Sequence, residues 1–216
     1  IVKLPSWPVF DKEQIDKTQE ILKSGKVNYW TGNEGKEFEK EFSRKFDSLY
    51  SVALANGSLA LSCAYLALNL KKGDEIITTP RTFIATSSSA VLLGLKPVFV
   101  DVDLNSGAIT AESILKAITN KTKAIVVVHL GGWPADMVQI CSIAKEYSIP
   151  IIEDCSQAHG AKLNGKNVGT YGDIATWSFC QDKIITTGGE GGMLSTNNFN
   201  YFNKVWSFKD HGKSRE

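Results

Sequence analysis

Short apolar runs and amphipathic stretches alternate along most of this chain. Strands are predicted where apolar runs end at turn residues, at positions 51–55, 75–79, 97–101, 124–129, 150–153, 174–179 and 192–195. Helices are predicted between the earlier strands, at positions 58–70, 83–93, 111–118 and 136–147, and again at 201–208. The runs at 125–128 and 150–152 lack polar alternation, which is typical of parallel strands covered on both faces. The pattern predicts an α/β fold, a three-layer α/β/α domain around a mainly parallel sheet.

Two helical patterns precede the first strand. Asp11 is a candidate N-cap, and Gly25 is a candidate helix stop. Phe38, Phe42 and Phe46 recur every four residues, so the second helix carries an aromatic stripe. Such a stripe is more typical of core packing than of a ligand site.

Composition and charge exclude several classes of protein. The chain has 216 residues, 43 % of them apolar, which is enough for a substantial core. A formal net charge of +1 argues against a broad electrostatic surface for nucleic acid or membrane. The four cysteines lack paired ligand spacing, so we expect no metal site and a reducing compartment, the cytoplasm. No signal-peptide pattern and no apolar run of membrane-spanning length occurs.

Lys183 stands between a predicted strand and a glycine-rich turn. The strand ends near Ser178, and Gly188-Gly-Glu-Gly-Gly192 follows the lysine. Ligands gather at strand ends in α/β proteins, and glycine lets a backbone approach a ligand closely. A lysine that loses hydration there favours the neutral amine that forms a Schiff base with a carbonyl. For a lysine chosen at random a surface position is the simpler interpretation, but these two neighbours favour a catalytic one.

Asp154 closes a second apolar strand, at positions 149–154. Successive strand residues point to opposite faces, so only one of Glu153 and Asp154 can face a ligand. Either acid could instead cap a following turn. A Schiff-base lysine together with a carboxylate for a pyridinium nitrogen is the signature of pyridoxal phosphate chemistry.

Gly57 and Ser58 follow the strand predicted at 51–55 and open the next helix. A helix start presents unpaired N–H groups and the positive end of the dipole, so this turn is a candidate phosphate site. On this segment alone a serine N-cap is the simpler interpretation. Phe83, within Thr-Phe-Ile-Ala, is likewise most simply a core residue.

Several motifs occur in a specific order along the chain. They are Ala55-Asn-Gly-Ser-Leu-Ala60, Pro80-Arg-Thr-Phe-Ile-Ala-Thr86, His129-Leu-Gly-Gly-Trp-Pro-Ala-Asp136, Glu153-Asp-Cys-Ser-Gln-Ala-His-Gly160 and the segment from Ser178 to Gly192. With this ordered set, the chain resembles the DegT/DnrJ/EryC1/StrS family of pyridoxal-phosphate sugar aminotransferases, which have the aspartate-aminotransferase-like fold type I. The resemblance covers nearly the whole chain and implies pyridoxal 5′-phosphate as the cofactor.

The resemblance also implies a role for each candidate residue. Lys183 becomes the Schiff-base lysine that shuttles a proton between substrate and cofactor, and Asp154 faces the pyridine nitrogen. The remaining cofactor contacts are Gly57, Ser58 and Ser178 at the phosphate, Gln157 at the phenolic oxygen and Phe83 stacked on the ring. No histidine is expected to act as the general base, because in this family the lysine transfers the protons.

Two departures from the family pattern and one agreement bear on these assignments. Cys180-Gln181 stands where many members have His-Pro, which affects cofactor tuning rather than the class. Ser58 replaces a more usual threonine and keeps the hydroxyl group. The family also contains dehydratases that carry histidine in place of the lysine, so Lys183 argues against that branch.

Three hypotheses follow. The preferred one, which the resemblance implies, is an aminotransferase that moves the amino group of L-glutamate to a nucleotide-linked keto-sugar, for amino-sugar or polysaccharide biosynthesis. The alternatives are a pyridoxal-phosphate nucleotide-sugar dehydratase and an inactive large-domain fragment. The resemblance further implies a homodimer. The residues do not reveal which sugar, nucleotide or carbon atom is used.

The resemblance sets the expected domain organisation. Residues 1–50 should form a helical segment packed on the large domain, and residues 51–208 should form the cofactor-binding α/β domain. Residues 209–216 should begin the connection to a C-terminal small domain that is largely absent from this chain, because family members are considerably longer.

Overall fold

The computed structural model describes residues 6–214. Within these residues, the main sheet contains β1 (Tyr50–Leu54), β2 (Glu75–Thr78), β3 (Lys96–Phe99), β4 (Thr122–Val128), β5 (Ile151–Asp154), β8 (Ile174–Ser178) and β9 (Gly192–Thr196). The helices are α1 (Lys12–Ser24), α2 (Glu34–Lys45), α3 (Gly57–Ala67), α4 (Ala85–Leu92), α5 (Ala111–Ala117), α6 (Met137–Glu146) and α7 (Phe199–Lys209). A short 3-10 turn, η1 (Leu130–Gly132), follows β4, and β6 (Lys162–Leu163) pairs with β7 (Lys166–Asn167) outside the sheet.

The sheet is mostly parallel, as the sequence predicts. Its strand order is β1-β9-β8-β5-β4-β2-β3, and β9 runs antiparallel to both of its neighbours, β1 and β8. The pairs β2–β3, β2–β4, β4–β5 and β5–β8 are all parallel. The carboxyl ends of β4, β5 and β8 therefore lie side by side. In open α/β sheets, ligands typically bind just outside the carboxyl ends of the parallel strands.

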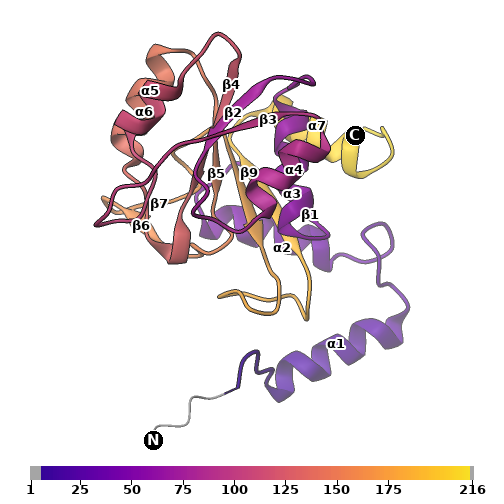
Figure 1. Ribbon diagram of the computed structural model, residues 1–216. Coiled ribbons are helices and arrows are strands. Elements are labelled where there is room, and N and C mark those ends of the chain that lie inside the picture. The colour runs from indigo at the N-terminus through magenta and orange to yellow at the C-terminus, as the bar shows by residue number, and fades with distance from the viewer. Residues whose placement is uncertain (1–5, 215–216) are drawn as a thin grey trace, which may run out of the picture.

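Both faces of the sheet are covered, which confirms the interpretation of the continuous apolar runs. In β4, Val126 packs into the core beneath α3 and α7, whereas Ile125 and Val127 pack into the core beneath α5 and α6. Figure 1 shows these helices in separate layers on either side of the strands. A strand buried on both sides needs no polar face, so its sequence shows no alternation.

The aromatic stripe of α2 is part of the core. Phe42 lies 5.2 Å from Trp177 between ring centroids, and Phe38 lies 5.2 Å from Phe179. Phe46 packs on Trp177 at 4.9 Å. These rings pack against the end of β8, so α2 supports the segment that leads to Lys183.

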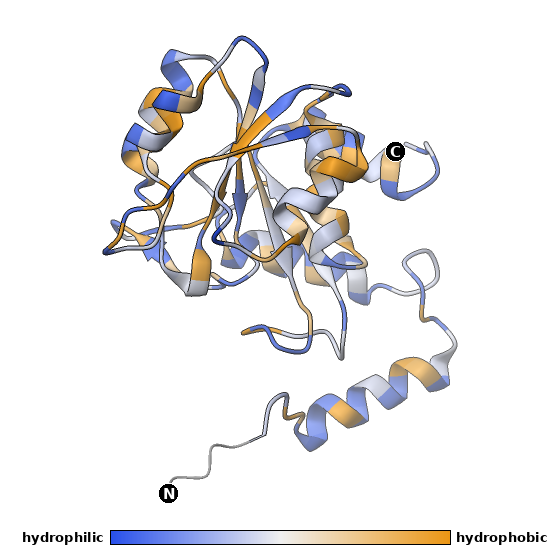
Figure 2. Cartoon of the chain, in the orientation of Figure 1, coloured by the Kyte–Doolittle hydropathy of each residue, from blue (hydrophilic) through white to orange (hydrophobic). Residues whose placement is uncertain are grey.

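The first helix behaves differently from the second. Asp11 caps α1 through a bond to Gln14 N, and Gly25 ends it in a left-handed conformation with φ of 70°, as predicted. However, α1 has no buried residue, and Figure 1 shows it projecting away from the sheet domain. Its apolar residues Ile15 and Leu22 are exposed, and Figure 2 shows this helix as mostly hydrophilic with a few hydrophobic bands. Packing on the large domain is thus observed for α2 and not for α1, and the domain boundaries at 50 and 208 stay predictions.

The predicted elements differ from the observed ones mainly at their ends. The helix expected from residue 83 begins at Ala85, and the one expected from residue 58 begins at Gly57. The β6–β7 hairpin was not predicted, because two-residue strands leave no periodic signal. Across residues 6–214, no helix combines the length and hydropathy needed to cross a membrane.

Candidate active site

A cavity of about 520 Å³ opens at the carboxyl ends of β4, β5 and β8. The start of α3 and the loop before α4 complete its walls. All seven predicted site residues line it: Gly57, Ser58, Phe83, Asp154, Gln157, Ser178 and Lys183. These residues come from distant parts of the chain, so the fold is what brings them together.

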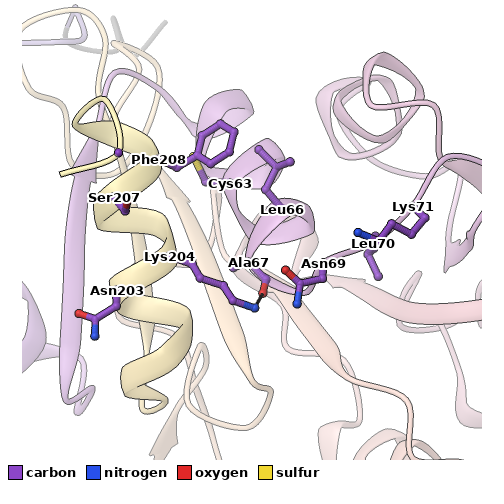
Figure 3. A pocket seen from close by; sticks show the side chains of 11 residues that line it. Cys63, Leu66, Ala67, Asn69, Leu70, Lys71, Asn203, Lys204, Ser207 and Phe208 are labelled. Atoms are coloured by element: carbon purple, nitrogen blue, oxygen red, sulfur yellow. Dashed lines mark hydrogen bonds between the residues drawn. The ribbon is translucent and has the colours of Figure 1, made fainter. Parts of the chain in front are cut away.

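A larger cavity lies elsewhere and contains none of these residues. Figure 3 shows it between α3 and α7, lined by Leu66, Lys204 and Phe208 among others. Lys204 Nζ donates to the carbonyl of Ala67 across it, at 3.0 Å. Its volume of about 780 Å³ exceeds that of the first cavity, but its lining has no paired acid and base. Chemistry therefore favours the cavity at the strand ends.

Asp154 is held firmly at the end of β5 with one side facing the cavity. Its side chain is only 5 % exposed, and Oδ2 accepts a hydrogen bond from Thr86 Oγ1 at 2.7 Å. Oδ1 accepts a bond from the backbone N–H of Ser156 at 3.2 Å. A buried carboxylate is costly unless hydrogen-bonded, and these donors reduce that cost.

Glu153 points to the opposite face and has a structural role, as strand alternation predicts. Its two carboxylate oxygens accept bonds from the backbone N–H groups of Gly169, Tyr171 and Gly172 at 2.6–2.8 Å. His129 Nε2 lies 2.9 Å from Oε2 of the same carboxylate. Because His129 Nδ1 accepts from a backbone N–H at 3.2 Å, the ring proton lies on Nε2 and is donated to Glu153. Both acids therefore accept backbone N–H groups of later turns: Asp154 from Ser156 in the turn that directly follows it, and Glu153 from the loop at 169–172.

His129, Glu153 and Cys155 bring three potential metal-ligand atoms within 4.8 Å of one another. Both nitrogens of His129 and both oxygens of Glu153 already form hydrogen bonds. Burial, with the Glu153 and Asp154 charges, raises the pKa of the Cys155 thiol well above its ordinary value, so the thiolate that a metal needs is disfavoured. This cluster is a support for β5 rather than a metal centre.

The start of α3 fits closely against β8 and β9. Asn56, not Ser58, is the N-cap, and its side chain accepts from Leu59 N at 2.9 Å. A Cβ at Gly57 would lie 2.9 Å from Ser178 Cβ, and one at Gly192 would collide with the Asn56 carbonyl oxygen. Only glycine fits at these contacts. Ser58, which is exposed, and Ser178 both line the cavity beside the start of α3, where the first N–H groups of the helix are unpaired.

Lys183 lies on the exposed loop of residues 180–191. Its side chain is 17 % exposed, and Nζ lies 3.2 Å from the Asp182 carboxylate. This bond to Lys183 lowers the pKa of Asp182 from its ordinary value. Trp7 Nε1 donates to the Lys183 carbonyl at 3.2 Å, so the N-terminal segment also contacts the loop. Gly188 and Gly189 have positive φ angles of 88° and 149°, which favour glycine, as expected for the glycine-rich turn.

Gln157 and Phe83 occupy different parts of the cavity wall. The side-chain oxygen of Gln157 accepts from Gly131 N at 2.8 Å, which leaves its NH₂ group as the free donor. Phe83 is 64 % exposed, so the simpler interpretation from the sequence, that it is a core residue, is wrong. An exposed ring on a cavity is available for stacking on a flat ligand.

His159 is buried, at 8 % exposed, among the aromatic residues that support β8. Its ring stands 5.5 Å from both Trp177 and Phe179 between centroids, so its surroundings are mainly apolar. Burial, aided by the Lys183 charge, lowers the pKa of His159 to about 4. The residue is a neutral part of the packing at neutral pH.

Sequence reasoning missed several residues that line this cavity or lie directly behind it. Asn56 carries a recognisable signal, since asparagine before Gly-Ser is a strong N-cap. Thr86, which donates to Asp154, gives no local signal, because its partner is 68 positions away. Asp182 and Glu190 also line the cavity and come from the lysine-bearing loop.

Comparison with known proteins identifies the family. Residues 8–216 match the DegT/DnrJ/EryC1/StrS aminotransferase family. The GDP-perosamine synthase of Escherichia coli O157:H7 is 40 % identical over 208 residues, which are 95 % of this chain and 57 % of that protein. The crystal structure of an aminotransferase from Psychrobacter cryohalolentis superposes with a TM-score of 0.97 at 52 % identity, covering 99 % of this chain and 54 % of that one.

A related dehydratase also matches. An E. coli GDP-4-keto-6-deoxy-D-mannose-3-dehydratase structure with bound hydrated PLP gives a TM-score of 0.88 at 32 % identity, over 96 % of this chain and 55 % of that one. The chain thus spans about half the length of the proteins it matches. Fold, ordered motifs and family match agree, and the chain belongs to the DegT/DnrJ/EryC1/StrS aminotransferase family.

Proposed function

We propose that the chain forms the cofactor-binding part of a pyridoxal-phosphate-dependent sugar aminotransferase. The observation that carries the proposal is the single cavity shared by Asp154, Lys183 and the start of α3. The donor set fits the cofactor: a hydrogen-bonded carboxylate suits a pyridinium nitrogen, a helix start suits a phosphate, and a lysine suits an aldehyde. The volume of about 520 Å³ is within the usual range for cofactor sites.

Each polar contact of the cofactor has a candidate in this chain. The first N–H groups of α3 with the Ser58 and Ser178 hydroxyls would bind the phosphate. Asp154 would bind the ring nitrogen, and the free NH₂ group of Gln157 would donate to the phenolic oxygen. Phe83 would cover one face of the ring and exclude water from it. When bound, pyridoxal phosphate supplies a cationic ring that accepts electrons from the substrate carbon.

Lys183 would carry the proton in the reaction. Its Nζ would hold the cofactor covalently at rest and, once displaced by the amino donor, would take the proton from the donor Cα. Asp182 lies 3.2 Å from Nζ and would hold the ammonium when the lysine is not bound. No histidine is needed as the base, because His129 is committed to Glu153.

The amino donor would be L-glutamate and the acceptor a nucleotide-linked keto-sugar. Support for the acceptor comes from the 40 % identity to a GDP-perosamine synthase. The identity of the sugar depends on groups outside this cavity. Within the described residues, Lys183 is the cation on the cavity lining, so a second cation for the donor carboxylate would come from elsewhere.

A second chain is the candidate source of such groups, and we propose a homodimer. Phe83, Ile84 and Ile184 are large apolar residues on or beside the cavity wall that are 58–66 % exposed. Analytical sedimentation of the intact protein tests this: a dimer supports the proposal, and a monomer that still transfers amino groups contradicts it. Four free cysteines are compatible with the cytoplasm as its compartment.

Nucleotide-sugar dehydration is the second candidate function, since a dehydratase matches at 32 % identity. Product analysis separates the two activities. Incorporation of nitrogen from labelled glutamate into the sugar supports the aminotransferase, whereas loss of water without nitrogen supports the dehydratase.

The first test is an absorbance spectrum of the protein with pyridoxal phosphate, before and after L-glutamate. A long-wavelength band that glutamate converts to a shorter-wavelength one supports the proposed half-reaction. A band that glutamate leaves unchanged contradicts the donor, and the absence of any band contradicts the cofactor site and favours an inactive fragment.

A further inference from the structure

Thr86 is a buried group in direct contact with the Asp154 carboxylate. It is the second residue of α4, its side chain is 0 % exposed, and its Oγ1 lies 2.7 Å from Asp154 Oδ2. A carboxylate has no proton to give, so the hydroxyl donates. Rotation of an aspartate carboxyl about its last bond is only weakly restricted, and a buried donor of this kind fixes it.

Thr82 continues the chain of hydrogen bonds. Its Oγ1 lies 2.8 Å from Thr86 Oγ1. Because the Thr86 proton is directed to Asp154, the proton between the two threonines comes from Thr82. Thr82 therefore donates to Thr86, and Thr86 donates to Asp154. In the low dielectric of the interior, each of these hydrogen bonds polarises the next.

Tyr65 fixes the backbone from which Thr86 acts. Its hydroxyl donates to the Thr86 carbonyl at 2.7 Å in a fully buried contact between α3 and α4. Burial, with a contribution from the Asp154 charge, raises the pKa of Tyr65, so the hydroxyl keeps its proton. Thr86 is thus anchored at both its backbone and its side chain.

We propose that Thr86 is the positioning residue for Asp154: it holds the carboxylate in the orientation in which it meets the ring nitrogen of the cofactor. The inference rests on the proposed function. With Oδ2 bound by Thr86 and Oδ1 by Ser156 N, two donors from different segments set the carboxylate plane, and Asp154 lines the cavity. Residues that orient a binding group in this way typically affect function about 10- to 100-fold when removed.

The test compares Thr86→Val, which removes the hydroxyl at nearly constant volume, with Thr86→Ser, which keeps it. Thr78→Val is the matched control. Thr78 is also fully buried, and its Oγ1 donates at 3.0 Å to the carbonyl of Val126 rather than to Asp154. The intact protein is loaded with pyridoxal phosphate labelled with ¹⁵N in the ring. Three quantities are measured: the ¹⁵N chemical shift, which reports ring protonation, the cofactor dissociation constant, and kcat with KM.

For Thr86→Val we expect the ¹⁵N shift to move toward the unprotonated value, the cofactor dissociation constant to rise about tenfold, and kcat to fall about 10- to 100-fold with KM nearly constant. Thr86→Ser should restore most of each quantity, and Thr78→Val should leave the ¹⁵N shift unchanged. If Thr86→Val keeps the parent ¹⁵N shift, or if Thr78→Val moves it equally, the positioning role is overturned while the proposed function stands. A parent protein that binds no pyridoxal phosphate overturns both.

Discussion

The two halves of the cavity are built in opposite ways. The buried wall includes Asp154, Gln157 and Ser178, at or just after the ends of β5 and β8, and Thr86 lies behind it on α4. The lysine loop, residues 180–191, is largely exposed and carries Lys183. In the buried wall polar groups have fixed partners, such as Thr86 for Asp154 at 2.7 Å. In the lysine loop the reactive amine pairs with its neighbour Asp182.

This difference matches the demands of the proposed chemistry. Groups that stabilise charge work best when they are preorganised, because no energy is then spent on reorienting them during the reaction. A group that must leave one bond and carry a proton needs freedom to move, and segments with few buried contacts provide it. The sheet therefore holds the electrostatic part of the site, and the loop holds the part that changes place.

Removing the amine of the lysine loop should have the largest effect. Lys183→Ala should lower kcat by about 10²- to 10⁴-fold, because both the covalent attachment and the proton carrier are lost. The unfolding midpoint should change little, since the side chain is not in the core. Lys40→Ala, at an exposed position on α2 paired with Glu37, is the control and should keep the parental rate. A Lys183→Ala protein with more than about a tenth of that rate would rule out the proposed mechanism.

Removing the support behind the buried wall should act on stability instead. Glu153→Gln places an amide where backbone N–H groups and His129 all donate, so the free energy of unfolding should fall by about 3 kcal/mol. Urea denaturation measures this. Glu112→Gln, which breaks an exposed pair with Lys116, is the control and should leave the urea midpoint nearly unchanged, because exposed ion pairs contribute little to stability. Equal costs for the two variants would contradict the structural role of Glu153.

Glu153 and its neighbour Asp154 also show how far the sequence could predict the site. The period of two along β5 predicted that Glu153 and Asp154 face opposite sides, and the ends of apolar runs predicted where the cavity lies. The tie between Thr86 and Asp154 was out of reach, because it depends on which strand lies beside which. The same holds for Gly192 against Asn56, a contact that exists only because β9 inserts between β1 and β8. The exposure of α1 was missed because an amphipathic pattern does not reveal whether its apolar face meets this chain.

His159 packs against Trp177 and Phe179, which support the buried wall, and should make stability depend on pH. Its pKa is lowered to about 4, whereas an unfolded histidine titrates near 6.5. Below about pH 6.5 the unfolded chain gains a proton that the folded chain does not take up until about pH 4, so stability falls through this window. Between about pH 7 and about pH 4.5 the contribution of His159 to this loss of stability should be about 2 kcal/mol.

The measurement is a pair of urea titrations at the two pH values, on the parent and on His159→Phe. The variant keeps a ring between Trp177 and Phe179 but cannot bind a proton. Its loss of stability on acidification should be smaller than that of the parent by the predicted amount. Parallel losses in the two proteins would show that other groups cause the acid sensitivity.

The smallest expected effects come from replacing one glycine in each half of the cavity by alanine. Gly189 has φ of 149° and no atom within 4 Å of the place that an added methyl group would take, so Gly189→Ala adds only backbone strain, about 1 kcal/mol or somewhat more. Gly57 lies in a helix, and Gly57→Ala adds a contact of 2.9 Å with Ser178 Cβ instead.

Hydrogen exchange should therefore quicken in residues 180–191 for Gly189→Ala, with the cofactor dissociation constant nearly unchanged. Gly57→Ala should weaken cofactor binding without quickening exchange in the loop, because its strain falls on the buried wall. If both variants gave the same pattern, the two halves would form one cooperative unit, and the division between a fixed wall and a movable loop would not hold.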